Sequence, residues 1–228
     1  MEFVGIDKFS LLDYDEKVSI VLFSPACNFR CPFCHNGESV LNCNSEISFN
    51  EIYDYLEDRK NVIDAVVISG GEPTLMPELE ERIRKIRELG YLIKLDTNGS
   101  NPEILKHLID EKLLDFVAMD IKNSEKLYPL TTGCQKVNME NVKKSIQILN
   151  ESGISHEFRT TLVKEFHSPE SIKEMGELIK GSKKLYLQKF VDREGVIQKG
   201  LHEIDEESAK VFREILLKYI TECELRGY

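Results

Sequence analysis

Apolar runs separated by amphipathic stretches recur along the chain. Residues 18–23 form such a run, which is typical of a parallel strand buried on both faces. A capping box from Ser48 to Glu51 then opens a predicted helix that extends to about residue 59. The same strand-then-helix pattern repeats, and it predicts further strands at residues 65–69, 91–95, 116–121, 157–163 and 185–190.

The predicted helices carry recognisable start and stop signals. Leu79, Ile83 and Ile86 lie on one stripe of a helix that stops at Gly90, and Pro102 lies in the first turn of the next helix. The remaining predicted helices cover residues 139–149 with Gly153 as the cap, 168–180, and 205 to about 226.

Six strand-then-helix units predict an α/β fold with a parallel sheet covered by helices. Six strands are too few to close a standard eight-stranded barrel, so we expect a partial (βα)6 TIM-type barrel over residues 18–228. An open doubly wound sheet is the alternative that six units also allow. Residues 1–17 are rich in turn-forming types, and we expect an N-terminal extension or a short hairpin against the barrel edge.

Polar groups follow several of the predicted strands. Right-handed crossovers place all strand carboxyl ends at one rim, where enzymes of this architecture build their sites. Each group also has an ordinary structural explanation, as a tight turn, a helix cap or an ion pair. Together, at successive strand ends, they predict a functional site. The groups are Gly70-Gly71-Glu72, Asp96, Asn98, Asp120, Lys122, Arg159 and Gln188.

Composition and charge limit the classes of partner. The 228 residues include 41% hydrophobic and 31% charged residues, as expected of a globular protein. The net charge of −10 argues against nonspecific nucleic-acid binding, which needs a basic surface. No apolar run approaches the length of a membrane span, and the N-terminus has no signal-peptide pattern. We therefore expect a cytoplasmic protein, in which clustered cysteines bind metal instead of forming disulfides.

Three cysteines, Cys27, Cys31 and Cys34, directly follow the first predicted strand. A zinc site needs a fourth ligand. His35 is poorly placed for this because adjacent side chains rarely reach the same small tetrahedron, and Cys43 could serve only if a loop folded back. A [4Fe–4S] cluster fits better, because three thiolates hold three irons and leave the fourth open to a substrate. Zinc and the absence of a metal remain alternatives.

The motifs around these residues resemble those of a known enzyme family. The spacing C-x3-C-x2-C, with Phe33 before the last cysteine, is similar to the signature of the radical S-adenosylmethionine (SAM) superfamily. The motifs C-H-N at residues 34–36, G-G-E-P at 70–73, D-T-N-G at 96–99 and M-D-I-K at 119–122 resemble those of enzymes that activate glycyl-radical enzymes. L-Q-K-F at 187–190 and F-R-T-T at 158–161 favour the activators of anaerobic ribonucleoside-triphosphate reductase over those of pyruvate formate-lyase.

This resemblance implies two cofactors, SAM and a [4Fe–4S] cluster held by Cys27, Cys31 and Cys34. A low-potential donor such as flavodoxin or ferredoxin would supply one electron, which would cleave the S–C5′ bond of SAM. The resulting 5′-deoxyadenosyl radical would remove a Cα hydrogen atom from a glycine of a partner glycyl-radical enzyme. In such enzymes the cofactor carries the chemistry, and the protein positions and shields it.

The resemblance also implies roles for the rim residues. Gly70, Gly71 and Glu72 would hold the SAM ammonium group. Asp120 and Lys122, with Arg159, would hold the ribose and the carboxylate. The other candidates are Asp96 and Asn98 at the sulfonium end or at a cation, Phe33 near the adenine, and His35 as a hydrogen-bonding neighbour of the cluster. No role is implied for Cys43, Cys134 or Cys223.

Two other functions remain open. The same chemistry could act on a small molecule or an RNA base. Alternatively, the protein could be an iron–sulfur electron-transfer module that does not cleave SAM. The Gly-Gly-Glu turn favours an enzyme, since an electron carrier has no need of it.

Overall fold

The computed structural model describes residues 2–37, 41 and 47–228, so Cys43 lies outside the described residues. The strands are β1 (Gly5–Ser10), β2 (Ser19–Ser24), β3 (Ala65–Gly70), β4 (Leu92–Thr97), β5 (Phe116–Asp120), β6 (Ser155–Leu162), β7 (Lys184–Lys189) and β8 (Glu222–Arg226). The helices are α2 (Phe49–Glu57), α3 (Leu79–Glu88), α4 (Pro102–Asp110), α5 (Tyr128–Thr132), α6 (Met139–Ser152), α7 (Pro169–Leu178) and α8 (Glu206–Leu216). Two 3-10 turns are η1 (Pro73–Leu75) and η2 (Glu125–Leu127).

The strands form an eight-stranded sheet in which the spatial order follows the chain order. β1 pairs antiparallel with β2, as expected of an N-terminal hairpin, and β2–β3, β3–β4, β6–β7 and β7–β8 pair in parallel. The predicted α/β class with six strand–helix units is confirmed. The predicted boundary between an extension at 1–17 and a core at 18–228 remains a prediction.

One compact unit contains β1 to β4, α2 to α4 and the start of β5 up to Ala118. Its parallel strands are apolar on both faces, as expected of strands in the interior of such a sheet. Its helices bury Leu56, Ile83 and Leu105 almost completely, which is the stripe that helical periodicity predicts. The capping box at Ser48 and Glu51 is confirmed.

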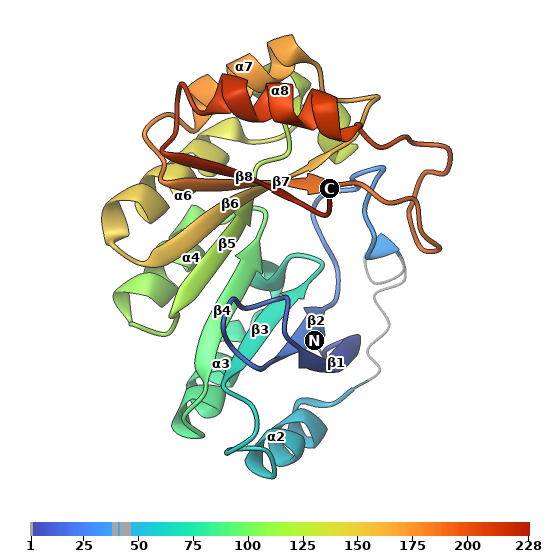
Figure 1. The fold of residues 1–228 in the computed structure, drawn as a ribbon. Coiled ribbons are helices and arrows are strands. Elements are labelled where there is room, and N and C mark those ends of the chain that lie inside the picture. The colour runs from blue at the N-terminus through green and yellow to red at the C-terminus, as the bar shows by residue number, and fades with distance from the viewer. Residues whose placement is uncertain (1, 38–40, 42–46) are drawn as a thin grey trace. The chain divides into compact units, whose positions relative to one another are not determined.

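A second compact unit contains Phe29–Gly37, Asn98–Ser100 and Met119–Tyr228. In it α7 and α8 lie side by side, and α8 contacts β8 (Figure 1). Thr160 on β6 turns its hydroxyl towards the sulfur of Met175 on α7, at 3.6 Å, so this face of the sheet is covered by helix. Gly153 caps α6 in the left-handed conformation, as predicted.

The predicted final helix is wrong beyond Leu216. Residues Glu222–Arg226 form β8 instead, parallel to β7. In β8 the buried Cys223 lies between the exposed Glu222 and Glu224, which is the two-residue period of a strand. None of the described helices is long and apolar enough to cross a bilayer.

Candidate active site

The Gly70–Gly71 turn packs directly against the segment that leads into the cysteine loop. Gly70 adopts φ +103°, and a Cβ there would lie 2.5 Å from the Ser24 nitrogen. A Cβ on Gly71 would overlap the carbonyl group of Ala26. The N–H groups of Gly71 and Glu72 donate to the carbonyl oxygens of Ser24 (3.0 Å) and Ala26 (2.8 Å). The missing side chains of both glycines admit the neighbouring backbone, and their predicted contact with the SAM ammonium group remains a prediction.

The side chain of Glu72 is fully buried and holds the turn together. Its Oε1 accepts hydrogen bonds from the Thr74 N–H (3.2 Å), the Thr74 hydroxyl (2.5 Å) and the Thr97 hydroxyl (2.8 Å). These bonds tie the end of β3 to the end of β4. Glu72 therefore acts by positioning the turn. A ligand that binds at the Gly70-Gly71-Glu72 turn would contact its main-chain groups.

Asp96 and Asn98 belong to different units. Asp96, at the end of β4 in the first unit, is 8% exposed and accepts a hydrogen bond from the Ser69 hydroxyl at 3.0 Å. Asn98, in the second unit, accepts the Ser100 N–H at 2.9 Å, as a side chain does in a turn.

The three cysteines differ in exposure. Cys27 and Cys34 are half-buried, and Cys31 is buried. Ala26, just before Cys27, adopts φ +55°, which is uncommon for a residue with a Cβ. The N–H of Cys34 donates to the carbonyl oxygen of Cys31 at 2.9 Å, which forms a tight turn between these two thiols.

Main-chain bonds within the second unit hold the rest of the loop. The N–H of Arg30 donates to the Thr132 carbonyl oxygen at 2.8 Å. The N–H of Gln198 donates to the Pro32 carbonyl oxygen, also at 2.8 Å. Gly133 follows Thr132, and a Cβ on it would overlap the Arg30 carbonyl. The protein backbone itself therefore shapes the loop.

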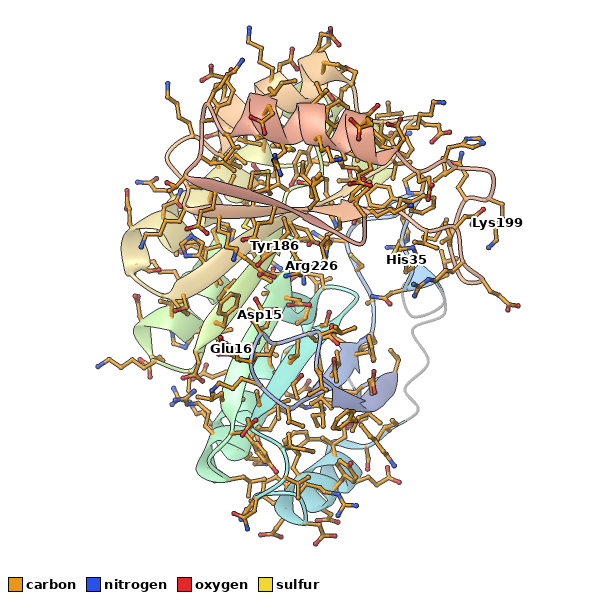
Figure 2. The ribbon with its side chains drawn as sticks, viewed as in Figure 1. Asp15, Glu16, His35, Tyr186, Lys199 and Arg226 are labelled. Atoms are coloured by element: carbon orange, nitrogen blue, oxygen red, sulfur yellow. The ribbon has the colours of Figure 1, made fainter. Side chains whose placement is uncertain are left out.

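Two aromatic side chains flank the last cysteine. Phe33 is buried; its ring lies 6.0 Å from that of Phe166 and 5.9 Å from the Lys122 nitrogen. The exposed ring of His35, which is labelled in Figure 2, stacks on Phe190, with 5.7 Å between centroids and an interplanar angle of 6°. Its Nε2 donates to the Val191 carbonyl oxygen at 2.8 Å. His35 therefore bonds to the backbone of the segment that follows β7, and its role as a neighbour of the cluster remains a prediction.

Asp120, Lys122 and Arg159 form one ionic cluster, so these three predicted residues are brought together. The Lys122 ammonium lies 2.8 Å from Oδ2 of Asp120, and Nε of Arg159 lies 3.0 Å from Oδ1. Burial alone would raise the pKa of Asp120, but the two cations outweigh it and lower the pKa to about 2. Burial alone would lower the pKa of Lys122, but the negative charge of Asp120 outweighs this effect and raises the pKa of Lys122. The cluster is thus fully charged at neutral pH, with one net positive charge.

Three residues that the sequence analysis did not identify support this cluster. The buried His167 donates from Nε2 to the Lys122 carbonyl oxygen (3.0 Å) and accepts the Val163 N–H at Nδ1 (3.1 Å). The amide of Asn123 donates to the Phe166 carbonyl oxygen at 2.7 Å. The Tyr128 hydroxyl lies 3.5 Å from the Asp120 carbonyl oxygen, and burial raises its pKa. Isolated polar residues of this kind carry no motif that could identify them.

The donor set fits an iron–sulfur cluster. Burial raises the pKa of Cys34, and the nearby Lys122 partly offsets this by favouring the thiolate that binds iron. Among the described residues, no three His, Cys, Asp or Glu side chains surround one point as the ligands of a single ion would. A cubane does not require that arrangement, because each thiolate binds a different iron.

Comparison with known proteins agrees with this donor set. Residues 21–179 match the family model of the radical SAM superfamily. A Methanocaldococcus jannaschii protein named as a glycyl-radical enzyme activating enzyme is 32% identical, over 97% of this chain and 94% of its own length. The pyruvate formate-lyase-activating enzyme of Clostridium pasteurianum is 29% identical, over 77% of this chain and 75% of its own.

A solved structure shares the fold at low identity. The radical SAM methyltransferase from Sphaerobacter thermophilus superposes with a TM-score of 0.72 at 16% identity, over 94% of this chain and 68% of that one. The matched family model covers more than half of the sequence, including all three loop cysteines. The chain therefore belongs to the radical SAM superfamily of enzymes, which use a [4Fe–4S] cluster and SAM.

Proposed function

We propose that this enzyme activates a glycyl-radical enzyme, and that its partner is an anaerobic ribonucleoside-triphosphate reductase. The observation that carries the proposal is the similarity, along nearly the whole chain, to the M. jannaschii protein that is named as an activating enzyme. The motifs around Cys34, Asp96 and Asp120 support it, because together they resemble those of activating enzymes. The reductase is preferred over pyruvate formate-lyase on the motifs at residues 158–161 and 187–190.

The cysteine loop would hold the cluster. Cys27, Cys31 and Cys34 are the three ligands, and Phe33 and His35 fix the loop on either side of Cys34 through Phe166 and Phe190. When bound, the cluster and SAM supply a one-electron cleavage of the S–C5′ bond. The products are methionine, 5′-deoxyadenosine and a partner glycine that has lost one Cα hydrogen atom. The electron comes from a low-potential donor such as flavodoxin or ferredoxin.

The charged cluster of the second unit would orient SAM. Lys122 and Arg159 offer N–H donors to a carboxylate, and Asp120 offers an acceptor to ribose hydroxyl groups. Phe33 would pack near the adenine. Asn98 would lie at the sulfonium end or bind a cation there.

In the first unit, main-chain carbonyl groups of Gly70, Gly71 and Glu72 would accept hydrogen bonds from the SAM ammonium group. Asp96 would lie at the sulfonium end or bind a cation there. Because the buried carboxylate of Glu72 is used by two threonines, the ammonium contact would depend on the turn rather than on that side chain.

The test is an anaerobic assay with reconstituted, reduced protein, SAM and the partner reductase, read by electron paramagnetic resonance. We expect a glycyl doublet split by one α-hydrogen, lost when the partner glycine is changed to alanine. Cys27→Ala, Cys31→Ala and Cys34→Ala should each abolish the signal and the cluster absorbance, whereas Cys134→Ala and Cys223→Ala should retain both. SAM cleavage without a glycyl signal on any glycyl-radical enzyme of the source organism would refute the activating function. It would favour a small-molecule or RNA substrate and leave the superfamily assignment intact.

A further inference from the structure

Two neutral polar side chains face each other beside the charged cluster. Thr161 on β6 and Gln188 on β7 are direct partners in the parallel register. In the pair of positions two residues nearer the start of each strand, Arg159 and Tyr186 are partners in the same way. Because side chains two residues apart share a face, Thr161 and Gln188 lie on the face of Arg159, one step nearer the carboxyl ends.

The side chains of this pair make no hydrogen bond to the described part of the chain, and both are half-buried. Polar groups that are not bonded to protein bond to water or to a ligand. The hydroxyl and the carboxamide are therefore available to a hydrogen-bonding ligand that displaces water from this face.

The neighbours of the pair define where such a ligand can lie. Arg226 on β8 stacks over Tyr186, with its guanidinium carbon 3.7 Å from the ring centroid, and also reaches Glu157 at 3.7 Å (Figure 2). These side chains fill the face on the amino-terminal side of Gln188. On the other side, Phe190 stacks on His35, the residue after Cys34. The pair thus lies between the side chains of Tyr186 and Arg226 on one side and the residues that flank the cysteine loop on the other.

The chemistry of the pair matches a peptide main chain. A glycine has no side chain, so only the peptide groups on either side of it can orient its Cα. A carboxamide and a hydroxyl each donate and accept, as a neutral peptide group does. The charged ends of SAM instead match Asp120, Lys122 and Arg159, which carry formal charges.

We infer that Thr161 and Gln188 bind the main-chain amide groups beside the substrate glycine and so orient its Cα. This inference deepens the proposed function and rests on it for the identity of the peptide. It assigns the positioning of the glycine to amide recognition on β6 and β7.

Near-isosteric variants test the pair. Gln188→Met and Thr161→Val remove the hydrogen-bonding groups and keep the volume approximately. Gln147→Met is the matched control, because the side chain of this exposed glutamine on α6 bonds, among the residues that the structure describes, to Glu151 alone. The probe is a fluorescein-labelled peptide that spans the radical glycine of the partner reductase. Its binding to the reconstituted protein with SAM is followed anaerobically by fluorescence anisotropy, and SAM affinity is measured in parallel.

We expect each variant to weaken peptide binding roughly 2- to 12-fold, as the loss of one neutral hydrogen bond does, with SAM affinity unchanged. The KM for the partner should rise by a similar factor. Wild-type peptide affinity in both variants would overturn the inference. An equal loss of SAM affinity would also overturn it, because the pair would then belong to the cofactor site. So would a wild-type protein that binds no such peptide from any glycyl-radical enzyme of the source organism.

The two proposals fail separately. A glycyl signal that is as strong in both variants as in the wild type, with unchanged KM, would leave activation standing and refute the role of the pair. Peptide binding that depends on both residues, without a glycyl signal, would support the pair and refute activation.

Discussion

Two cations bracket the carboxylate of Asp120 and lower its pKa to about 2, although burial alone would raise it. The ammonium group of Lys122 has three N–H donors, and Asp120 accepts from it at one oxygen, so Lys122 can also donate to a further anion. A bound carboxylate would therefore complete the cluster.

The variant Lys122→Met, which removes one positive charge, tests whether the cluster binds the carboxylate of SAM. We expect SAM affinity to fall roughly 10- to 150-fold, since a hydrogen bond to a charged group contributes about 1.5–3 kcal/mol. The cluster absorbance should be retained, because Lys122 is not a ligand. Lys106→Met, which breaks an exposed ion pair with Asp110, serves as the control. Unchanged SAM affinity in the Lys122 variant would mean that the ion pair is only structural.

Gly71→Ala tests the contact between the turn and the cysteine loop. The added Cβ would overlap the Ala26 carbonyl, so the backbone must shift. We expect the free energy of unfolding of the apoprotein to fall by about 1–3 kcal/mol, measured by urea denaturation. Gly5→Ala is the control, because its added Cβ would meet only the Phe23 ring, at an ordinary 3.5 Å. Equal stability of the two variants would contradict the close packing.

His167 predicts a pH dependence of stability. Burial lowers its pKa below the ordinary value of 6.5, so the folded protein holds it neutral. Above that value neither state binds the proton. As the pH falls below it, the unfolded chain binds a proton that the folded chain refuses. The free energy of unfolding should then drop by up to about 1.4 kcal/mol per pH unit until the folded pKa is reached.

Urea denaturation at several pH values, from about 8 to about 5, measures this term. His167→Gln should show a shallower decline than the wild type, and His107→Gln, which changes an exposed histidine, should keep the wild-type decline. Parallel curves for the wild type and the His167 variant would show that the imidazole is not held neutral.

At the scale of elements, the strand β8 contributes the thiol of Cys223. Cys223 is buried towards α8, and burial raises its pKa to about 12. The thiolate is the reactive form, so we expect alkylation of Cys223 by iodoacetamide in native apoprotein to be at least roughly 100-fold slower than that of an ordinary thiol. The half-buried Cys134 is the internal comparison, followed by peptide mass spectrometry. Equal labelling of both before denaturant is added would contradict the position of Cys223.

The elements show what the sequence could predict. The six parallel strands follow from their apolar runs, because a strand covered on both faces has few polar positions. β8 could not be recognised, because Glu222, Glu224 and Arg226 are compatible with a helix pattern that begins at Asp205. Pairing with β7 decides the outcome, and this contact is distant in the sequence.

The residues of the candidate site also fall into those that the sequence could predict and those that it could not. The cluster of Asp120, Lys122 and Arg159 was predictable, since each residue lies on or directly after a predicted strand. His167 was not, because it lies far along the chain from Lys122, and Tyr128, although close to Asp120 in sequence, belongs to no motif. The role of Glu72 also required the structure, which shows its carboxylate turned to Thr74 and Thr97.

At the scale of the whole molecule, SAM binding and stability are linked. A ligand that binds only the folded state at a concentration of about 100 times its Kd stabilises by about 2.7 kcal/mol. For a chain of this size the thermal midpoint of the reconstituted protein should rise by roughly 5–11 °C, measured by anaerobic calorimetry. The Lys122→Met variant should shift less at the same SAM concentration. An identical shift in both proteins would contradict a role for Lys122 in SAM binding.

Hydrogen bonds between main-chain groups anchor the cysteine loop at Ala26, Arg30 and Pro32. Bonds of this kind do not depend on the side chain of the residue that makes them. A substitution that removes one thiol therefore leaves these anchors in place. A variant such as Cys34→Ala should lose a cluster ligand and keep the path of the loop, so its defect would be chemical and not structural.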